Sequence, residues 1–300
     1  MSKVLIIGAQ NIDIFTKSYM DMVEGDSNPA KINLAFGGVG RNIAVNLKRL
    51  GHNVHFLTVF GDDVFSKYAQ QSLLKLGVKT KESLFLNNAN NSIYLGIMDK
   101  ESNLHMGFND MQIIEKLNPD YLKSKLDVIL GFDTIIIDNN LNELSIDYLL
   151  SQVKEKTVVM DAVSAHKAYK LKKHLDKISI LKLNQMELDE LSKYSSSKKQ
   201  LEELHLRGAK TILLTNQEKE SILSQGKISI SQKPEPLEKI ENTSGAGDAF
   251  LCGYLHGFLL KKSEENRLKM ANYAAGVTLS SADSISPQLS SDFLEKAFHE

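Results

Sequence analysis

Small residues run directly into a carboxylate in the string Thr243-Ser-Gly-Ala-Gly-Asp-Ala-Phe250. Gly245, Ala246 and Gly247 allow the backbone to turn tightly, and the apolar run that follows predicts a buried helix. The N-terminus of such a helix presents unpaired N–H groups and a positive dipole end, which favour phosphate. Asp248 would repel a bound phosphate unless it accepts a proton from an attacking hydroxyl, so it is a candidate general base for phosphoryl transfer. The alternative is an ordinary first-turn carboxylate that the helix dipole stabilises.

Polar residues close to the N-terminus could hold a sugar. The apolar run Val4–Ile7 predicts a buried strand, and the loop Gly8-Ala-Gln-Asn-Ile-Asp13 follows it. The carboxylate of Asp13 can accept hydrogen bonds from two adjacent hydroxyls. The alternative is that Asn11 and Asp13 are turn formers, because both residue types favour turns.

Asn42 is a second candidate for sugar binding. It lies in the first turn of a helix predicted over residues 42–50 from its apolar spacing, and Gly51 can end that helix. The pair Gly37-Gly38 interrupts the chain just before this helix. An amide beside bare backbone can both donate to and accept from a ribose hydroxyl.

The elements that position these residues are clearest in the second half of the chain, where short β-branched or aliphatic runs recur. Helical patterns separate the first three runs, and this alternation predicts a parallel sheet with helices on both faces. Ligands of such sheets bind at the carboxyl ends of the strands, where Asp161, Asn184 and Thr215 stand. The predicted strands span residues 134–137, 157–160, 178–183 and 211–214.

Asn184 and Glu187 are spaced to share one face of a helix. One carboxylate together with waters and substrate phosphates suits Mg²⁺, which prefers oxygen ligands and loses water reluctantly. The alternative is a solvated helix start without a metal.

Composition excludes several classes of function. The net charge of -1, from 36 basic and 37 acidic side chains, leaves no electrostatic footprint for nucleic acid. No apolar run approaches the roughly 18 residues that a membrane-spanning helix needs, and the N-terminus predicts a strand rather than a signal peptide. We therefore expect a cytoplasmic protein with neither membrane nor nucleic-acid partners. The single Cys252 cannot form an internal disulfide.

Two motifs together resemble those of the ribokinase-like carbohydrate and nucleoside kinases. The string 243–250 is similar to the C-terminal signature of that family, and Phe36-Gly-Gly-Val-Gly-Arg-Asn-Ile-Ala44 is similar to its N-terminal Gly-Gly-x-x-x-Asn-x-Ala motif. The resemblance implies one α/β domain over residues 1–300, with a three-layer fold and a mainly parallel central sheet between helices. It also implies a small β lid, from about residues 14–36 and 85–109, through which two copies could form a homodimer.

The resemblance assigns roles to the candidate residues. It implies that Asp248 is the general base and that the amides of 245–247 stabilise the transferring phosphoryl group, while Glu187 holds Mg²⁺. The helix 271–276 is similar to the small-residue helix that packs against adenine in this family, although packing on a neighbouring helix explains its small residues almost as well. Residues implied to hold the ribosyl substrate are Asn11, Asp13, Gly38 and Asn42, and those implied to contact ATP are Asn184, Thr215, Gly245, Gly247 and Asn272.

The chain departs from the family pattern in two places. The family commonly has Thr-x-Gly-x-x-Gly along the nucleotide, whereas Thr215-Asn-Gln-Glu-Lys-Glu220 lacks both glycines. Asn242 stands where many members carry Asp near a monovalent-cation site, which leaves a requirement for K⁺ open.

Further strings resemble the pseudouridine kinase branch of the family: Asp110-Met111 and Asp161-Ala-Val-Ser-Ala-His-Lys167. The resemblance therefore implies an ATP-dependent kinase for the 5′-hydroxyl of pseudouridine, ahead of a ribokinase or an inosine, cytidine or adenosine kinase. The alternative from another class is a non-catalytic sugar-binding regulator on the same fold. The missing glycines after Thr215 favour the regulator, and the intact Asp248 argues against it.

Overall fold

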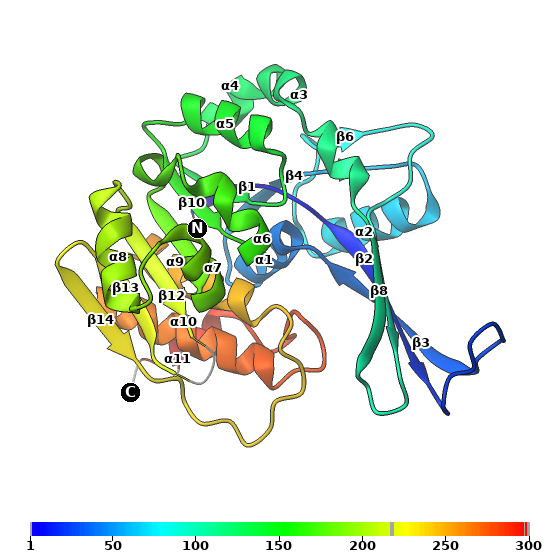
Figure 1. Cartoon of the computed structure of the whole chain (residues 1–300). Helices are drawn as coiled ribbons and strands as arrows, with labels where there is room; N and C mark the ends of the chain where they lie inside the picture. Colours follow the sequence, from blue (N-terminus) through cyan, green and yellow to red (C-terminus); the bar gives the residue numbers. More distant parts are fainter. Residues whose placement is uncertain (1, 217–218, 297, 299–300) are drawn as a thin grey trace.

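The computed structural model describes residues 2–216, 219–296 and 298 (Figure 1). Its main sheet has eight strands in the order β14-β13-β12-β11-β10-β9-β1-β4. All neighbours from β4 to β12 pair in parallel, and the pairs β12–β13 and β13–β14 are antiparallel, so the sheet is mainly parallel as the sequence predicts. The strands are β1 (Lys3–Ile7), β4 (Asn53–Leu57), β9 (Thr134–Asp138), β10 (Thr157–Asp161), β11 (Ile180–Asn184), β12 (Thr211–Thr215), β13 (Ser221–Gln225) and β14 (Ile228–Gln232).

Helices cover both faces of this sheet, and its strands are therefore buried on both sides. Val4 and Ile6 of β1 belong to one core cluster and Leu5 and Ile7 to the other, as the alternation of side chains along a strand requires. The first cluster packs against α1 (Val39–Arg49), α2 (Val64–Lys75), α9 (Ala246–Leu259), α10 (Glu264–Leu279) and α11 (Ser291–Lys296). The second packs against α3 (Pro119–Ser124), α4 (Leu126–Leu130), α5 (Glu143–Gln152), α6 (Ala165–Ala168), α7 (Gln185–Leu191), α8 (Ser197–Leu206) and the 3-10 helices η1 (Gln112–Lys116), η2 (Tyr169–Leu171) and η3 (Leu175–Lys177).

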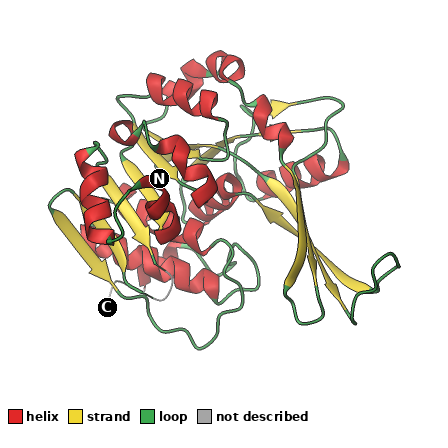
Figure 2. Cartoon of the chain, viewed as in Figure 1, coloured by secondary structure: helices red, strands yellow, loops and turns green. Residues whose placement is uncertain are grey.

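A second sheet of four strands projects away from the main body (Figure 2). Its order is β3 (Ala30–Gly37), β2 (Asn11–Ser18), β7 (Ile93–Met98) and β8 (Leu104–Asp110). These strands lie in the two chain segments from which the sequence predicts a lid. A short pair, β5 (Val59–Phe60) and β6 (Leu84–Phe85), lies between the two parts.

The interpretation of Asn11 and Asp13 as turn formers is wrong. Both residues lie on β2, where Asn11 is in register with Gly37 and Asp13 with Ala35 of β3. The loop after β1 is therefore only three residues long, from Gly8 to Gln10. Pairing with β3 and β7 overrides the local preference of Asn and Asp for turns.

Within the described part of the chain, no helix is both long enough and apolar enough to cross a membrane.

Candidate active site

The carboxyl ends of the central strands bring several charged side chains together. Asp138 ends β9, Asp161 ends β10, and Lys182 lies near the end of β11. Cα pairing places Asp161 beside both of the others. Counting from the apolar residues of each strand, all three side chains fall on the face that packs against α1 and α9.

The string 243–250 contains the start of α9, which begins at Ala246. Gly245 is the N-cap residue with a φ of 78°, a left-handed conformation that favours glycine. A Cβ at Gly245 would also collide with the carbonyl oxygen of Ser284. The first hydrogen bond of the helix runs from Ala249 N to Gly245 O, so the amides of residues 246–248 have no partner within the helix. The structure thus has the helix start that the sequence predicts, with amides free of partners within the helix.

Asp248 is buried in the first turn of α9, where it accepts a hydrogen bond of 2.8 Å from Asn42 Nδ2. Burial raises the pKa of Asp248 to about 8, and repulsion from Asp161 adds to this shift. The Lys182 ammonium and the Asn42 amide act in the opposite direction. Two residues more than two hundred positions apart, each singled out from the sequence, are thus in direct contact.

Lys182 is a site residue that the motifs do not reveal. It is buried, and its Nζ lies 3.1 Å from Asp161 Oδ2. A Cβ at Gly247 would lie 2.7 Å from the same Nζ, so Gly247 gives the ammonium access to the start of α9. Burial alone lowers the pKa of Lys182, but the three carboxylates around it outweigh burial and raise the pKa. The signal in the sequence is a lysine inside the otherwise apolar run 180–183.

Asn184 and Glu187 form a capping box at the start of α7. The Asn184 side chain accepts from Glu187 N at 2.9 Å, and the Glu187 carboxylate accepts from Asn184 N at 2.8 Å. Asn184 Nδ2 also donates to Glu187 Oε1. Asn184 is thus the N-cap residue of α7, and Glu187, three residues later, lies in the first turn of the helix.

The buried Glu187 fits the metal chemistry expected of it. Each of its carboxylate oxygens accepts a hydrogen bond from Asn184 and keeps a second lone pair. Among the described residues, no group of three or more His, Cys, Asp or Glu side chains could hold a metal ion. A cation here would take most of its ligands from phosphate and water, which is how Mg²⁺ binds in phosphoryl-transfer sites.

Asp138 is a second residue that the motifs do not reveal, and it joins three segments. Its Oδ2 accepts hydrogen bonds of 2.9 Å from Ala9 N, after β1, and from Gly40 N, in the first turn of α1. Its Oδ1 accepts from Asn140 N at 2.6 Å. Gly8 leaves room for it, because a Cβ there would collide with the Asp138 side chain. This buried carboxylate fixes the loop before β2 against the helix that carries Asn42.

Asp13 and Asn42 each lie next to the corner formed by Gly37 and Gly38, where Asn42 N donates to Gly38 O. A Cβ at Gly37 would collide with the Asp13 carboxylate, and Gly38 is the N-cap of α1 with a φ of 97°. Asn11 Nδ2 donates to Asp13 Oδ1 and holds the carboxylate in place. Burial raises the pKa of Asp13, while the Asn11 hydrogen bond and the Arg41 charge act against this shift. The residues predicted to hold a sugar therefore lie around one point beside Asp248.

The residues predicted to contact a nucleotide lie further along the same edge. Thr215 ends β12 next to Asn184, and its hydroxyl lies 3.5 Å from Leu183 O. On α10, Asn272 Nδ2 donates to Ser221 Oγ at 2.8 Å, and the same residue lines an open hollow of about 590 Å³. Of the departing string 215–220, residues 217 and 218 lie outside the described residues.

The side chain of Asn242, at the expected cation site, forms hydrogen bonds with backbone groups near the start of α9. Its Nδ2 donates to Ala282 O at 3.0 Å, and its Oδ1 accepts from Ser244 N at 2.9 Å.

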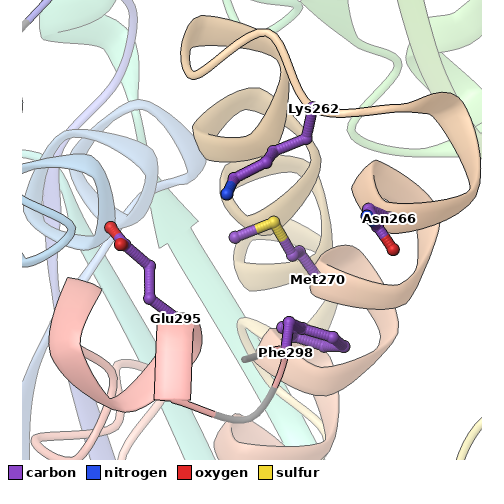
Figure 3. Close-up of a pocket in the computed structure, with 5 residues that line it drawn as sticks. All are labelled: Lys262, Asn266, Met270, Glu295 and Phe298. Atoms are coloured by element: carbon purple, nitrogen blue, oxygen red, sulfur yellow. The ribbon is translucent and has the colours of Figure 1, made fainter. Parts of the chain in front are cut away.

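A further cavity, of about 20 Å³, is lined by residues of α10, α11 and the chain that follows α9 (Figure 3). It has room for about one water molecule. It shares Asn266 and Phe298 with the hollow beside Asn272. Its lining residues are Lys262, Asn266, Met270, Glu295 and Phe298.

Comparison with known proteins identifies relatives of the whole chain. The family profile described as pfkB family carbohydrate kinase matches residues 1–291. The chain is 28% identical to the pseudouridine kinase of Escherichia coli (strain K12) over 293 residues, which cover 96% of this chain and 93% of that protein. It is 27% identical to the uncharacterized sugar kinase YeiI of the same organism, over 96% of this chain and 81% of that protein. The structure of Arabidopsis thaliana ribokinase complexed with ribose and ATP has a TM-score of 0.87 at 20% identity and covers 100% of both chains. This last similarity confirms the predicted ribokinase-like fold.

Proposed function

The chain belongs to the pfkB family of carbohydrate kinases, and from this premise we propose that it transfers the γ-phosphoryl group of ATP to the 5′-hydroxyl of pseudouridine. The observation that carries the chemistry is the contact of Asn42 with Asp248 at the start of α9, beside the Lys182 ammonium. A residue proposed to bind the ribosyl substrate (Asn42), a proposed base (Asp248) and a proposed anion site (Lys182 and the start of α9) lie next to one another here.

Asp248 would take the proton of the attacking hydroxyl. In its ionised form it is an acceptor only, and Asn42 occupies one of its oxygens, which leaves the other for the substrate. The transition state of phosphoryl transfer is loose, so positioning and charge stabilisation matter more than the strength of the base.

The negative charge of the transferring group would lie between Lys182 and the start of α9. The unpaired amides of residues 246–248 and the buried ammonium are preorganised donors in a site of low polarity. Glu187 would hold Mg²⁺, which when bound neutralises phosphate charge. The hollow beside Asn272 supports placing the adenine along α10.

Two kinds of observation favour pseudouridine over other ribosyl compounds. One is the 28% identity to a pseudouridine kinase over nearly the whole chain. The other is the pair of strings Asp110-Met111 and 161–167. Asp161 of the second string lies 3.1 Å from Lys182 Nζ, and it would therefore act at the phosphate site, while base selection would fall to the four-stranded sheet.

The four-stranded sheet would act as a lid and pair two copies of the chain. One of its faces carries large apolar side chains that are between 46% and 61% exposed. A contiguous apolar face of this kind marks an interaction site. A second copy of the same face would cover it symmetrically, which is the commonest form of assembly. These residues are Ile32, Leu34, Met106 and Phe108.

Initial rates with ATP and Mg²⁺ on pseudouridine, uridine, ribose and adenosine test the proposal. Pseudouridine carries an N1–H donor that uridine lacks, and a buried acceptor for it would be left unpaired by uridine. We expect kcat/KM for pseudouridine to exceed that for each other compound by at least about tenfold. If ribose or adenosine leads, the pseudouridine assignment is wrong, and if no compound yields ADP, the kinase proposal is wrong.

A further inference from the structure

The face of the four-stranded sheet that carries Asp13 also carries two aromatic rings. Asp13 of β2 is in register with Tyr94 of β7, and Phe15 is in register with Gly96. Residues in register on adjacent strands lie about 4.8 Å apart and point to the same side. The Tyr94 side chain therefore begins one strand away from the carboxylate that is proposed to hold the ribose hydroxyls.

The two rings pack together over bare backbone. Their centroids are 5.7 Å apart with an interplanar angle of 58°. A Cβ at Gly96 would lie 2.8 Å from the Phe15 ring, and one at Gly107 of β8 would lie 2.8 Å from Tyr94 Oη. The two glycines leave room for the rings to lie over the sheet and turn their other side away from it.

This arrangement is not explained by the packing of the main core. Phe15 and Tyr94 are only partly buried, and neither belongs to the two core clusters of the main sheet. The opposite face of the same sheet carries Ile14 and Leu95 together with the aromatic residues Phe36 and Phe108. The contact between the Phe15 and Tyr94 rings, on the face that carries Asp13, supports recognition of a flat ligand group.

We propose that Phe15 and Tyr94 form a stacking platform for the nucleobase, and that this platform selects nucleosides over free sugars. The inference rests on the proposed function and deepens it by naming the residues that recognise the base. In a nucleoside the base is attached at C1′, next to the vicinal hydroxyls. The group that stacks on the base must therefore lie beside the group that holds those hydroxyls, as Tyr94 lies beside Asp13.

Amides at both ends of the platform can read the edge of the base. Asn33 is in register with Phe15, and Asn109 is in register with Tyr94. Each amide offers both donors and acceptors, which match the imide and N1–H groups of a uracil joined through C5. Stacking alone tolerates any base, so the platform supplies affinity and these amides supply selection.

The test compares kcat/KM for pseudouridine and for ribose in Tyr94→Leu and Phe15→Leu. Because ribose has no base, loss of the platform should lower kcat/KM for pseudouridine at least about tenfold and change that for ribose less than about twofold. Tyr94→Phe keeps the ring and should stay within about threefold of the parent on both substrates. Phe108→Leu, on the opposite face of the sheet, is the control and should leave the ratio of the two substrates unchanged.

An equal loss on pseudouridine and ribose would overturn the platform and make the rings a structural support. Unchanged kinetics on both substrates would overturn it as well. If the parent protein phosphorylates neither compound, the proposed function fails first, and this outcome is distinct because it appears before any substitution is made.

Discussion

Asp248 acts within a group of charges rather than alone. It shares a buried site with Asp161, Lys182 and Glu187, and Asn42 fixes one of its oxygens. The positions of Asp248 and Asn42 could be predicted because short motifs of small residues mark them. Lys182 and Asp138 belong to no motif; each is marked only as a polar residue in an apolar strand, and only the assembled sheet gives them partners.

The charge of Asp161 should govern the pH dependence of the reaction. Asp248 must be ionised to accept a proton, and its raised pKa of about 8 predicts that kcat/KM increases with pH and levels off above that value. In Asp161→Asn the repulsion is removed and Lys182 acts unopposed on Asp248, so its pKa falls and the rise moves to lower pH. The profile of kcat/KM between about pH 6 and 9.5 measures this shift. The exposed Asp127 on α4 gives the control, Asp127→Asn. An unchanged profile, or a shift to higher pH, would contradict the assigned coupling.

At the scale of elements, the alternation of strands and helices is readable from sequence because both faces of the parallel sheet are buried. The four-stranded sheet is harder to predict from the sequence. β2 looks like a loop at its start, and its strand character depends on β3 and β7, the second of which lies far along the chain. Long-range pairing of this kind leaves little local signal.

Asp138 should stabilise the packing of β1, β9 and α1 on one another. In Asp138→Ala the N–H groups of Ala9 and Gly40 lose a buried acceptor, at about 1 to 3 kcal/mol for each unpaired group. We expect the free energy of unfolding from urea denaturation to fall by at least about 2 kcal/mol. Asp133→Ala, just before the other end of β9, removes an exposed carboxylate and should change it little. Equal stabilities of the two variants would mean that Asp138 does not brace these elements.

At the scale of the whole molecule, the four-stranded sheet presents different chemistry on its two faces. One face carries Asp13 and the aromatic pair, and the other is apolar and exposed. The period of two residues along each strand produces this division, so it follows from the sequence once the register is known. The register itself depends on the assembled sheet.

The apolar face should hold a dimer together in solution. Leu34→Glu places a charge on that face and should convert the dimer to a monomer, because burying an unpaired carboxylate is costly. Lys31→Glu, on the other face of β3, changes the charge by more and should leave the dimer intact. Sedimentation velocity gives the mass of each variant. A parent protein that sediments as a monomer, or a Leu34→Glu variant that remains dimeric, would contradict this assembly.

The most direct test of the account is the rate of ADP formation from ATP and pseudouridine in the parent protein and in Asp248→Asn. The substitution keeps the shape of the side chain and removes the base. We predict that kcat falls at least about 10²-fold while the dissociation constant of pseudouridine changes little. Near-normal turnover by Asp248→Asn would show that the proton of the attacking hydroxyl goes elsewhere, and the assignment of the active site to the start of α9 would be wrong.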